Sequence, residues 1–397
     1  MEDIKRVKLS EIVELITKGT TPTTLGYEFQ DEGVNFLKIE CFDENGGFIE
    51  SKVAHISEEC HKKMKRSQLK NGDILFSIAG AIGRVAIVTE EMLPANINQA
   101  LAIIRISDEQ VYLPYIKLIL TSPIVIEQFE RKKQGVAQLN LSLKDINEIS
   151  IPLPSKDKQI ELAELFDKVV GVISKRNKEL SALDDLIKAR FVEMFGDPVK
   201  NPKGWEVVTI GDIVTEVRYG TSKPAVEGGK YPYLRMNNLT ADGHLDLNDL
   251  KYIDIPDDEI EKCVVRKGDV LFNRTNSIEL VGKTVVFDLQ EDMIIAGYII
   301  RVRLNKRLLP EILSQYMNLE ALKDILRSMA KGAVNQANIN AQELRSIKVY
   351  IPDMELQKQF IEMKNQVDKS KFDTMTFAPI YDIINLYLHT HFYQGRR

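Results

Sequence analysis

The sequence contains one series of short motifs twice, in the same order. Residues 71–76 (Asn-Gly-Asp-Ile-Leu-Phe) return as 267–272, residues 103–106 as 299–302, residues 135–140 as 332–338, and Ile-Pro at 151–152 before Lys-Gln-Ile at 158–160 as 351–352 before Lys-Gln-Phe at 358–360. The copies lie 196 residues apart at Gly72, 198 at Gln138 and 200 at Pro152. Solenoid repeats have periods of about 20–50 residues. This longer period therefore predicts a tandem duplication of one whole module.

The composition permits two separate cores and favours a cytoplasmic protein. The chain has 397 residues and 44% hydrophobic content, enough for two domains of ordinary size. It lacks the run of about 20 apolar residues that a membrane helix needs, and its first residues lack the apolar core of a secretory signal. Its three cysteines, Cys41, Cys60 and Cys263, are odd in number and widely spaced, which favours reduced thiols.

The net charge of −5 is weak evidence against a protein that simply coats nucleic acid, because such proteins are usually basic. Local basic clusters occur at residues 61–66, 131–133 and 301–307. The ordinary interpretation of each cluster is a solvated face. The charge therefore leaves binding to DNA open.

The residue pattern predicts an α+β fold in each module. A Gly-Thr turn follows a short helical signal at Gly19 and again at Gly220. Short segments rich in β-branched residues, separated by Gly, Asn and Asp, predict a largely antiparallel sheet with a few helices packed on it. We expect strands at 34–39, 74–78, 85–88 and 102–106, with counterparts at 231–236, 270–272, 284–287 and 298–302, and helices at 113–131 and 310–330.

A long helix is predicted between the modules, over residues 156–195. Ser155 is the predicted N-cap, and Gly196-Asp197-Pro198 is predicted to end the helix. At 1.5 Å per residue it would be roughly 60 Å long. Apolar residues at steps of three and four form one narrow seam, which indicates a single partner helix. The seam residues are Leu162, Phe166, Val169, Ile173, Leu180, Leu183, Ile187, Phe191 and Met194.

A second spacer helix is predicted after Asp353, with the seam residues Leu356, Phe360, Met363 and Val367. A faithful duplication would pair the two helices antiparallel and hold the modules a fixed distance apart. The heptad spacing ends at about residue 372, and Pro379 breaks a helix. We therefore expect a shortened distal helix and an atypical tail outside the repeat, produced by truncation or by a shifted reading frame.

These elements together resemble the specificity subunit of type I restriction–modification enzymes. The resemblance is carried by the duplicated Gly-Asp-[Ile/Val]-Leu-Phe and Gly-x-x-Gln-x-Asn elements and by the Ile-Pro and Lys-Gln-hydrophobic start of each spacer helix. The junction at 194–198 (Met-Phe-Gly-Asp-Pro) and 201–205 (Asn-Pro-Lys-Gly-Trp) is similar to the family's junction after its central helix. The resemblance covers residues 1 to about 372.

The resemblance implies a DNA-binding restriction-system subunit without chemistry of its own. It implies target-recognition domains at 1–155 and 204–352, a coiled-coil spacer helix at 156–203, and a distal helix with its tail at 353–397. Each domain would read one half of a bipartite site in double-stranded DNA, and the spacer would dock two modification (methyltransferase) subunits. S-adenosylmethionine, ATP and Mg²⁺ would belong to those adenine-methylating subunits and to the restriction (endonuclease) subunits. Half-sites on one face of B-DNA lie about 34 Å apart, a separation that a rod of paired helices can set.

Candidate DNA contacts are polar side chains at predicted loops and strand ends, since base edges are read mainly by Arg, Lys, Asn and Gln. The alternative is that Asn and Ser there only make turns. In the first module the candidates are Lys18, Thr20, Thr21, Lys38, Ser77, Arg84, Asn98 and Gln99. In the second they are Arg218, Tyr219, Thr221, Lys223, Arg235, Asn237, Asn238, Asn273, Arg274 and Asn276.

Gln138 and Asn140 recur as Gln336 and Asn338, although two modules that read different half-sites should differ where they touch bases. A shared feature is better suited to contact phosphate or to brace the fold, and we favour bracing.

Catalytic and metal-binding interpretations find little support in the sequence. It has no methyltransferase Pro-Pro motif, no glycine-rich cofactor loop and no Walker motif. His55, Cys60 and His61 lack a second ligand pair at zinc spacing. Two alternatives to a specificity subunit stay open: a self-contained DNA-modifying enzyme with an unrecognised site, and a scaffold protein without DNA specificity.

Overall fold

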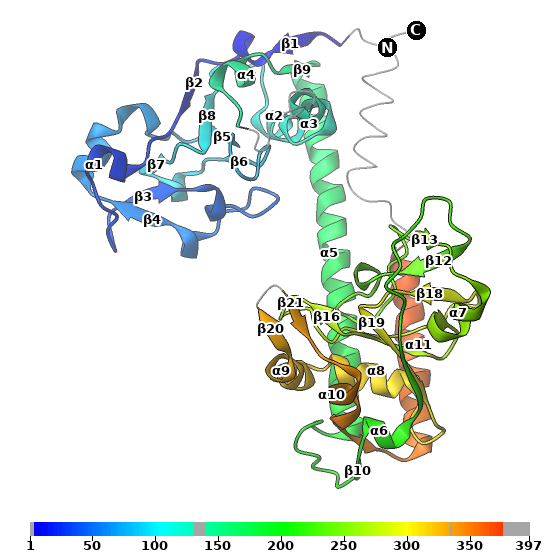
Figure 1. Cartoon of the computed structure of the whole chain (residues 1–397). Coiled ribbons are helices and arrows are strands. Elements are labelled where there is room, and N and C mark those ends of the chain that lie inside the picture. The colour runs from blue at the N-terminus through cyan, green and yellow to red at the C-terminus, as the bar shows by residue number, and fades with distance from the viewer. Residues whose placement is uncertain (1–3, 131–139, 334–335, 376–397) are drawn as a thin grey trace. The chain divides into compact units, whose positions relative to one another are not determined.

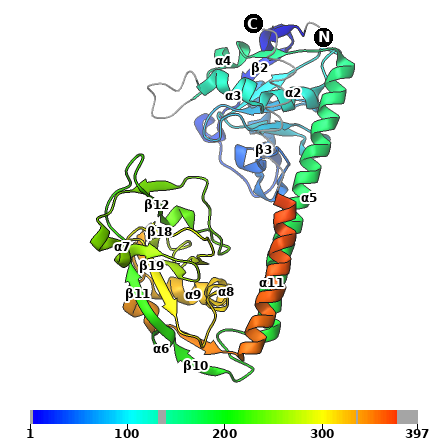
Figure 2. The same ribbon diagram turned by 90° about the vertical axis from the view of Figure 1, so that its right-hand side faces the viewer.

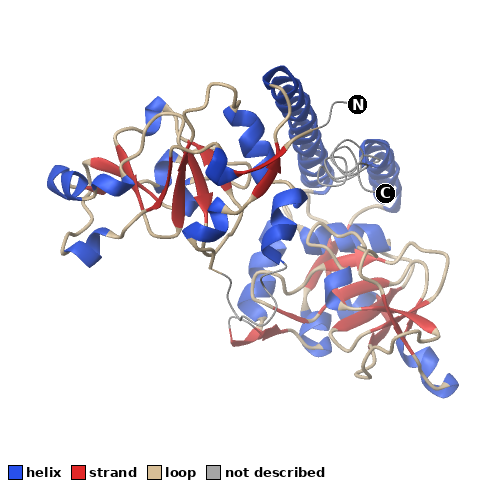
Figure 3. Ribbon diagram, turned by 90° about the horizontal axis from the view of Figure 1, so that it is seen from above, coloured by secondary structure: helices blue, strands red, loops and turns tan. Residues whose placement is uncertain are grey.

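The computed structural model describes residues 4–130, 140–333 and 336–375, and it divides at residue 175 into two compact units (Figure 1). Each unit contains one copy of the repeated motifs and mixes strands with helices (Figure 3). In the described part of the chain, no helix has the combination of length and apolar character that crossing a membrane requires.

The first unit contains a four-stranded antiparallel sheet in the order β2-β8-β5-β6 and a three-stranded sheet in the order β4-β3-β7. Strands β3 and β7 run parallel, and β1 pairs with β9 at the end of the module. The strands are β1 (Arg6–Lys8), β2 (Leu15–Lys18), β3 (Val34–Leu37), β4 (Ala54–Ile56), β5 (Ile74–Ser77), β6 (Val85–Ile87), β7 (Ala95–Ile97), β8 (Leu101–Arg105) and β9 (Ser150–Pro152). The helices are α1 (Glu58–Lys63), α2 (Leu113–Leu120), α3 (Pro123–Glu130) and α4 (Leu143–Asn147).

The second unit repeats this topology. Its two main sheets have the orders β11-β19-β15-β17 and β13-β12-β18-β14, the second with one more strand (β14) than in the first unit. Strands β12 and β18 again run parallel, β10 pairs with β22, and a further sheet has the order β16-β21-β20. The strands are β10 (Glu206–Thr209), β11 (Val214–Tyr219), β12 (Tyr231–Leu234), β13 (Lys251–Ile253), β14 (Val264–Val265), β15 (Val270–Asn273), β16 (Thr275–Asn276), β17 (Thr284–Val286), β18 (Met293–Ile295), β19 (Ile299–Leu304), β20 (Lys331–Ala333), β21 (Gln336–Asn338) and β22 (Lys348–Ile351). The helices are α6 (Ile210–Ile213), α7 (Asp257–Cys263), α8 (Pro310–Asn318), α9 (Glu320–Met329) and α10 (Ala341–Ser346). The predicted class, two similar mixed α/β modules, is confirmed.

Two predicted helices are each broken into a pair. The segment 113–131 forms α2 and α3, and the segment 310–330 forms α8 and α9. In the first module the break falls just before Pro123, whose ring disfavours helical backbone in the preceding residue. In the second, Leu319 is extended (φ −68°, ψ 143°) and serves as the N-cap residue of α9.

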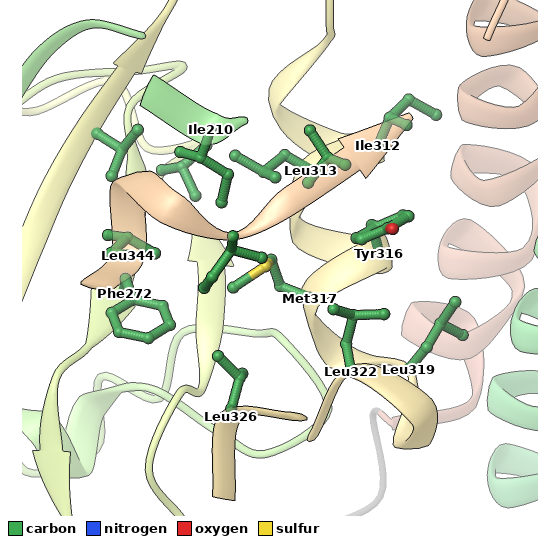
Figure 4. Packing of buried hydrophobic residues seen from close by; sticks show 14 of the residues in the cluster. Ile210, Phe272, Ile312, Leu313, Tyr316, Met317, Leu319, Leu322, Leu326 and Leu344 are labelled. Carbon is green, nitrogen blue, oxygen red and sulfur yellow. The ribbon is translucent and has the colours of Figure 1, made fainter. Parts of the chain in front are cut away.

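The repeated Gly-Asp-[Ile/Val]-Leu-Phe strand is apolar throughout because it is covered on both faces. In β15, Val270 and Phe272 join the core beneath the helices, whereas Leu271 between them joins the core against the second sheet. Figure 4 shows Phe272 in the first of these cores with Tyr316 and Met317 of α8 and other apolar side chains. A continuous apolar run is typical of a strand buried on both sides.

The long helix α5 (Lys156–Phe195) is continuous over 40 residues. Its first turns bury Leu162 and Phe166 in the first module's core, and its last turns bury Ile187, Phe191 and Phe195 in the second module's core. The prediction that Leu162 and Phe166 form a seam for a partner helix is therefore wrong. These two residues pack on their own module, because the N-terminal turns of α5 complete its core.

Helix α11 (Met354–Met375) packs against the C-terminal half of α5 (Figure 2). The rings of Phe191 and Phe360 lie 5.2 Å apart, and Lys371 forms an ion pair with Asp184. Because residue numbers rise along one helix as they fall along the other, the two helices are antiparallel, as predicted. The tail after Met375 and the residue Gln138 lie outside the described residues.

The strand register corrects two of the motif pairings made from the sequence. Ile74 is paired with Ile104, and its counterpart Val270 is paired with Val302, so residues 103–106 correspond to 301–304 rather than to 299–302. The helices give a second correction. Gln159 and Gln357 each donate Nε2 to a proline carbonyl five residues earlier, so Gln159 corresponds to Gln357 and not to Gln359. A shift of two residues keeps each side chain on its face of a strand, so the apolar pattern alone does not detect it.

Candidate DNA-contact surface

The turn before the central strand is fixed by a buried ion pair in both modules. Asp73 accepts hydrogen bonds from Nε and Nη2 of Arg105, each at 2.7 Å, and its Oδ2 also accepts the backbone N–H of Lys70. Asp269 receives Nε and Nη2 of Arg303 at 2.8 and 3.2 Å. The carboxylate hydrogen bond raises the pKa of each guanidinium above its ordinary value. These residues hold β5 to β8 and β15 to β19, so they are scaffold residues.

The Gly-Thr turn joins the two sheets of each module. A Cβ on Gly19 would lie 2.0 Å from the carbonyl oxygen of Ile97, and one on Gly220 would lie 2.2 Å from that of Ile295. Only glycine lets the end of β2 or β11 pass this close to the neighbouring strand. The threonine that follows donates its N–H to the same carbonyl in each module. The turn therefore fixes where the candidate residues beside it emerge.

Three predicted contact residues are interior, and the prediction is wrong for them. Ser77 and Asn273 are fully buried and Asn238 is 2% exposed. Each donates to a backbone carbonyl: Ser77 Oγ to Ala79 at 3.0 Å, Asn238 Nδ2 to Asp246 at 2.8 Å, and Asn273 Nδ2 to Thr275 at 3.2 Å. Buried carbonyls need such partners, so these polar side chains stabilise loops.

Other candidates of the first module lie where β2 and the β7–β8 loop end. Lys18, Thr20 and Gln99 are exposed, and Thr21 donates a hydrogen bond to Gln99. The other three candidates, Lys38, Arg84 and Asn98, contact residues of their own module. Lys38 Nζ lies 4.7 Å from the Phe29 ring centre, Arg84 Nη1 donates to the Phe42 carbonyl at 3.1 Å, and Asn98 Oδ1 accepts the N–H of Ala100 at 3.2 Å.

Most candidate cations of the second module are paired with carboxylates. Arg218, Lys223 and Arg235 form ion pairs of 3.1, 2.8 and 2.7 Å with Glu216, Glu259 and Asp249, respectively. Asn237 is exposed, and Thr221 Oγ1 accepts the N–H of Lys223 at 3.2 Å.

Arg274 is the exception among these cations. No carboxylate pairs with it in the part of the chain that the structure describes; its guanidinium carbon lies 5.0 Å from the ring centre of Tyr219. Its Nη1 is 3.5 Å from the Gly297 carbonyl, and its buried Nε has no hydrogen-bond partner there. Tyr219 is held in turn, because its hydroxyl accepts the N–H of Ala341 at 2.8 Å.

In the second Gly-x-x-Gln-x-Asn element, strand β20 pairs with β21, and β21 also pairs with β16. Asn338 Oδ1 accepts a hydrogen bond from Thr275 Oγ1 at 3.2 Å, and Asn276 Nδ2 donates to Asn273 Oδ1 at 2.9 Å. These contacts favour bracing for Asn338 and Asn276. Gln336 and, in the first module, Asn140 are exposed.

Two of the three residues considered for zinc, Cys60 and His61, have other partners. Cys60 is buried with its Sγ 3.4 Å from Met64 Sδ, and His61 Nδ1 lies 2.5 Å from Asn96 Oδ1. Within residues 4–130, 140–333 and 336–375, no three His, Cys, Asp or Glu side chains are grouped so that they could hold a metal ion.

The predicted site residues did not include Asp73 and Asp269, which form the ion pairs, or Gln159 and Gln357, which form the buried hydrogen bonds. Their signal was present, because the Gly-Asp and Lys-Gln motifs recur in both modules. Recurrence marks what the two modules share, which is the scaffold.

Two copies of one α+β module, with polar side chains presented at equivalent strand ends, define a duplicated recognition protein. The sequence profile of the type I restriction modification DNA specificity domain matches residues 1–182 and again residues 202–378. The chain belongs to the family of type I restriction–modification DNA specificity subunits, a class that is not catalytic. The predicted family and the predicted specificity function are confirmed.

Individual relatives agree with this family. The specificity subunit of the type I restriction enzyme EcoKI of Escherichia coli K12 is 22% identical over 382 residues, which are 89% of this chain and 82% of that protein. A putative MjaX specificity subunit of Methanocaldococcus jannaschii is 32% identical over 171 residues, 42% of this chain and 40% of that relative. A chain solved in work on complex assembly and conformational transition of the type I R-M system has a TM-score of 0.58 at 19% identity, with 98% of this chain and 97% of that chain covered, and it shares the fold.

Proposed function

We propose that the two modules, at residues 1–155 and 204–352, each read one half of a bipartite DNA site. The observation that carries the proposal is the repetition of one strand topology at the two ends of one continuous helix. Equivalent scaffolds present equivalent surfaces, so two modules on one chain suit two similar stretches of duplex. The exposed candidates, such as Lys18, Gln99, Asn237 and Gln336, are the residues we assign to this surface together with Arg274.

We propose that the spacer, α5 with α11, sets the distance between the half-sites. A 40-residue helix is roughly 60 Å long at 1.5 Å per residue, which exceeds the ~34 Å between half-sites one turn apart. The ends of α5 are buried in the module cores, so no loop interrupts the connection at either end. A change in the length of the helix would change the number of base pairs between the half-sites.

The same spacer is proposed to dock two modification subunits, with restriction subunits joining the complex. S-adenosylmethionine, ATP and Mg²⁺ would then be bound by those partners. The support is family membership together with the names of the relatives, which are subunits of type I restriction enzymes.

Selection from random duplexes tests the proposal. The full chain, assembled with its modification subunits, should enrich a sequence with two defined parts and a gap of fixed length. Absence of any enriched sequence would favour a scaffold without specificity. Binding of S-adenosylmethionine, or Mg²⁺-dependent cleavage of DNA, by the chain alone would favour a self-contained enzyme.

A further inference from the structure

The repeated register identifies which residues of the two modules occupy equivalent positions. The N–H of Ile78 bonds to the carbonyl of Ala100, and the N–H of Arg274 bonds to that of Tyr298, each at 2.9 Å. The carbonyl of Ile78 accepts from Leu141, and that of Arg274 accepts from Ile339. Arg274 therefore stands where the first module has Ile78, and Tyr298 stands where it has Ala100.

Tyr219 completes this set of three positions. It is paired with Ile300 on β19, and its counterpart Lys18 is paired with Ala102 on β8. The first module thus has Lys18, Ile78 and Ala100 where the second has Tyr219, Arg274 and Tyr298.

The two modules share their scaffold at this place and differ in surface chemistry. Ile78 is apolar and 5% exposed, whereas Tyr219 and Tyr298 are 44% and 51% exposed. The Gly-Thr turn beside these positions and the buried Asp–Arg pair at the other end of the central strand are the same in both modules. Residues that differ on a common scaffold are the ones able to make two modules prefer different sequences.

Arg274 is arranged to donate hydrogen bonds rather than to neutralise a carboxylate. Its guanidinium carbon lies over the ring of Tyr219, 5.0 Å from the ring centre, and a contact with a ring face uses none of the guanidinium N–H donors for a carboxylate. Its Nε is buried without an acceptor in the described residues, and Nη1 has only a 3.5 Å contact. A bidentate arginine on O6 and N7 of guanine is the commonest specific base contact in the major groove.

We propose that Arg274, positioned by Tyr219, reads a guanine in the half-site of the second module. The first module, with Ile78 at this position, makes no such contact, and the two half-sites therefore differ at the corresponding base pair. This inference rests on the proposed function, and it adds the residue and the base that distinguish the second half-site.

The test uses the full chain assembled with its modification subunits and a library of random duplexes, so that no recognition sequence is assumed in advance. Wild type, Arg274→Ala, Arg274→Lys and the control Arg345→Ala are compared. Arg345 lies on α10 of the same module and, like Arg274, has no carboxylate partner in the described residues. We expect both Arg274 variants to lose the preference for guanine at one position of one half-site, with affinity for the wild-type site falling by roughly 5- to 150-fold.

The lysine variant separates base reading from charge, since it keeps the charge but loses the planar fork. Both variants should unfold at the temperature of the wild type, and the other half-site should be unchanged. Loss of affinity that is equal for all sequences would overturn the inference in favour of a phosphate contact, as would wild-type selectivity in Arg274→Lys. If wild type itself selects no bipartite site, the proposed function fails; if it selects one and Arg274→Ala keeps it, only the present inference fails.

Discussion

Asp73, in the turn before β5, and Arg105, at the end of the neighbouring strand β8, form an ion pair of 2.7 Å, with the Asp73 side chain 1% exposed and that of Arg105 14% exposed. Asp269 and Arg303 make the same contact in the second module. The Gly-Asp motif recurs because its carboxylate anchors the turn to an arginine on the neighbouring strand. Only the strand register shows that the two arginines occupy equivalent positions.

Removal of Asp73 should destabilise the first module selectively. Asp73→Ala leaves Arg105 without its carboxylate in a poorly solvated place, and breaking such a pair costs about 3–5 kcal/mol. Hydrogen exchange should show faster opening of β5 and β8 and unchanged protection in the second module; Asp269→Ala should give the reverse. Lys8→Ala is the control, since its pair with Glu148 is half exposed and such pairs contribute about 0–1 kcal/mol. Equal loosening of both modules by Asp73→Ala would contradict this prediction.

Gln357→Ala should lower the free energy of unfolding of the second module by about 2–3 kcal/mol. Gln357 is fully buried, accepts the N–H of Leu309 at 2.9 Å, and donates to the carbonyls of Arg307 and Pro352 at 3.1 and 2.8 Å. The variant leaves the buried Pro352 carbonyl unpaired, at a cost of about 1–3 kcal/mol, whereas the Leu309 and Arg307 groups are only partly buried and contribute less. Gln359→Ala, two residues along the same helix and exposed, should change stability by less than about 0.5 kcal/mol. Denaturant unfolding of both variants measures the difference, and equal effects would show that the assigned hydrogen bonds do not stabilise the module.

Helix α11 should be less stable in acid. Burial opposes ionisation of Asp368, but its ion pairs with Lys364 and Lys371 outweigh burial and hold its pKa below the ordinary 3.8. A depressed carboxyl pKa contributes stability that is present above the unfolded value and lost as pH falls through the folded value. Unfolding free energies from pH 6 down to 2.5 should therefore fall more steeply in wild type than in Asp368→Asn. Asp185→Asn, at a carboxylate 73% exposed, serves as the control and should keep the wild-type slope.

Lys323 should give the second module a stability that rises in alkali. Burial, the largest cause, lowers the pKa of Lys323 to about 8 from 10.5, and its Nζ donates to the Gly282 carbonyl at 2.8 Å. Between those pH values the unfolded chain binds more protons than the folded one, so stability increases with pH. The shift corresponds to about 3 kcal/mol at 1.36 kcal/mol per pK unit. Relative to wild type, Lys323→Met should lose this rise; exposed Lys306→Met should retain it. An unchanged pH profile in Lys323→Met would refute the assignment.

The candidate contact residues show what residue type can and cannot predict. Arg274 and Ser77 were selected by the same rule, polar side chains beside a repeated strand. Ser77 is buried and donates to a loop carbonyl, whereas the guanidinium carbon of Arg274 lies 5.0 Å from the ring centre of Tyr219. Whether a polar side chain serves the solvent or an interior carbonyl depends on the backbone packed around it. That backbone comes from distant parts of the sequence.

The sequence by itself determined the duplication, the α+β class, the long helix between the modules and the family, because repeated motifs and apolar spacing are local properties of the chain. Only the tertiary structure showed that Arg105 and Arg303 occupy equivalent positions in the two modules. It also showed that Leu162 and Phe166 join a module core instead of a helix seam. It also placed Arg274 where the first module has Ile78. The physical reason for the register is that a shift of two residues leaves every strand residue on the same face of its sheet. Only the hydrogen-bonded partners in the folded chain therefore distinguish one strand register from the other.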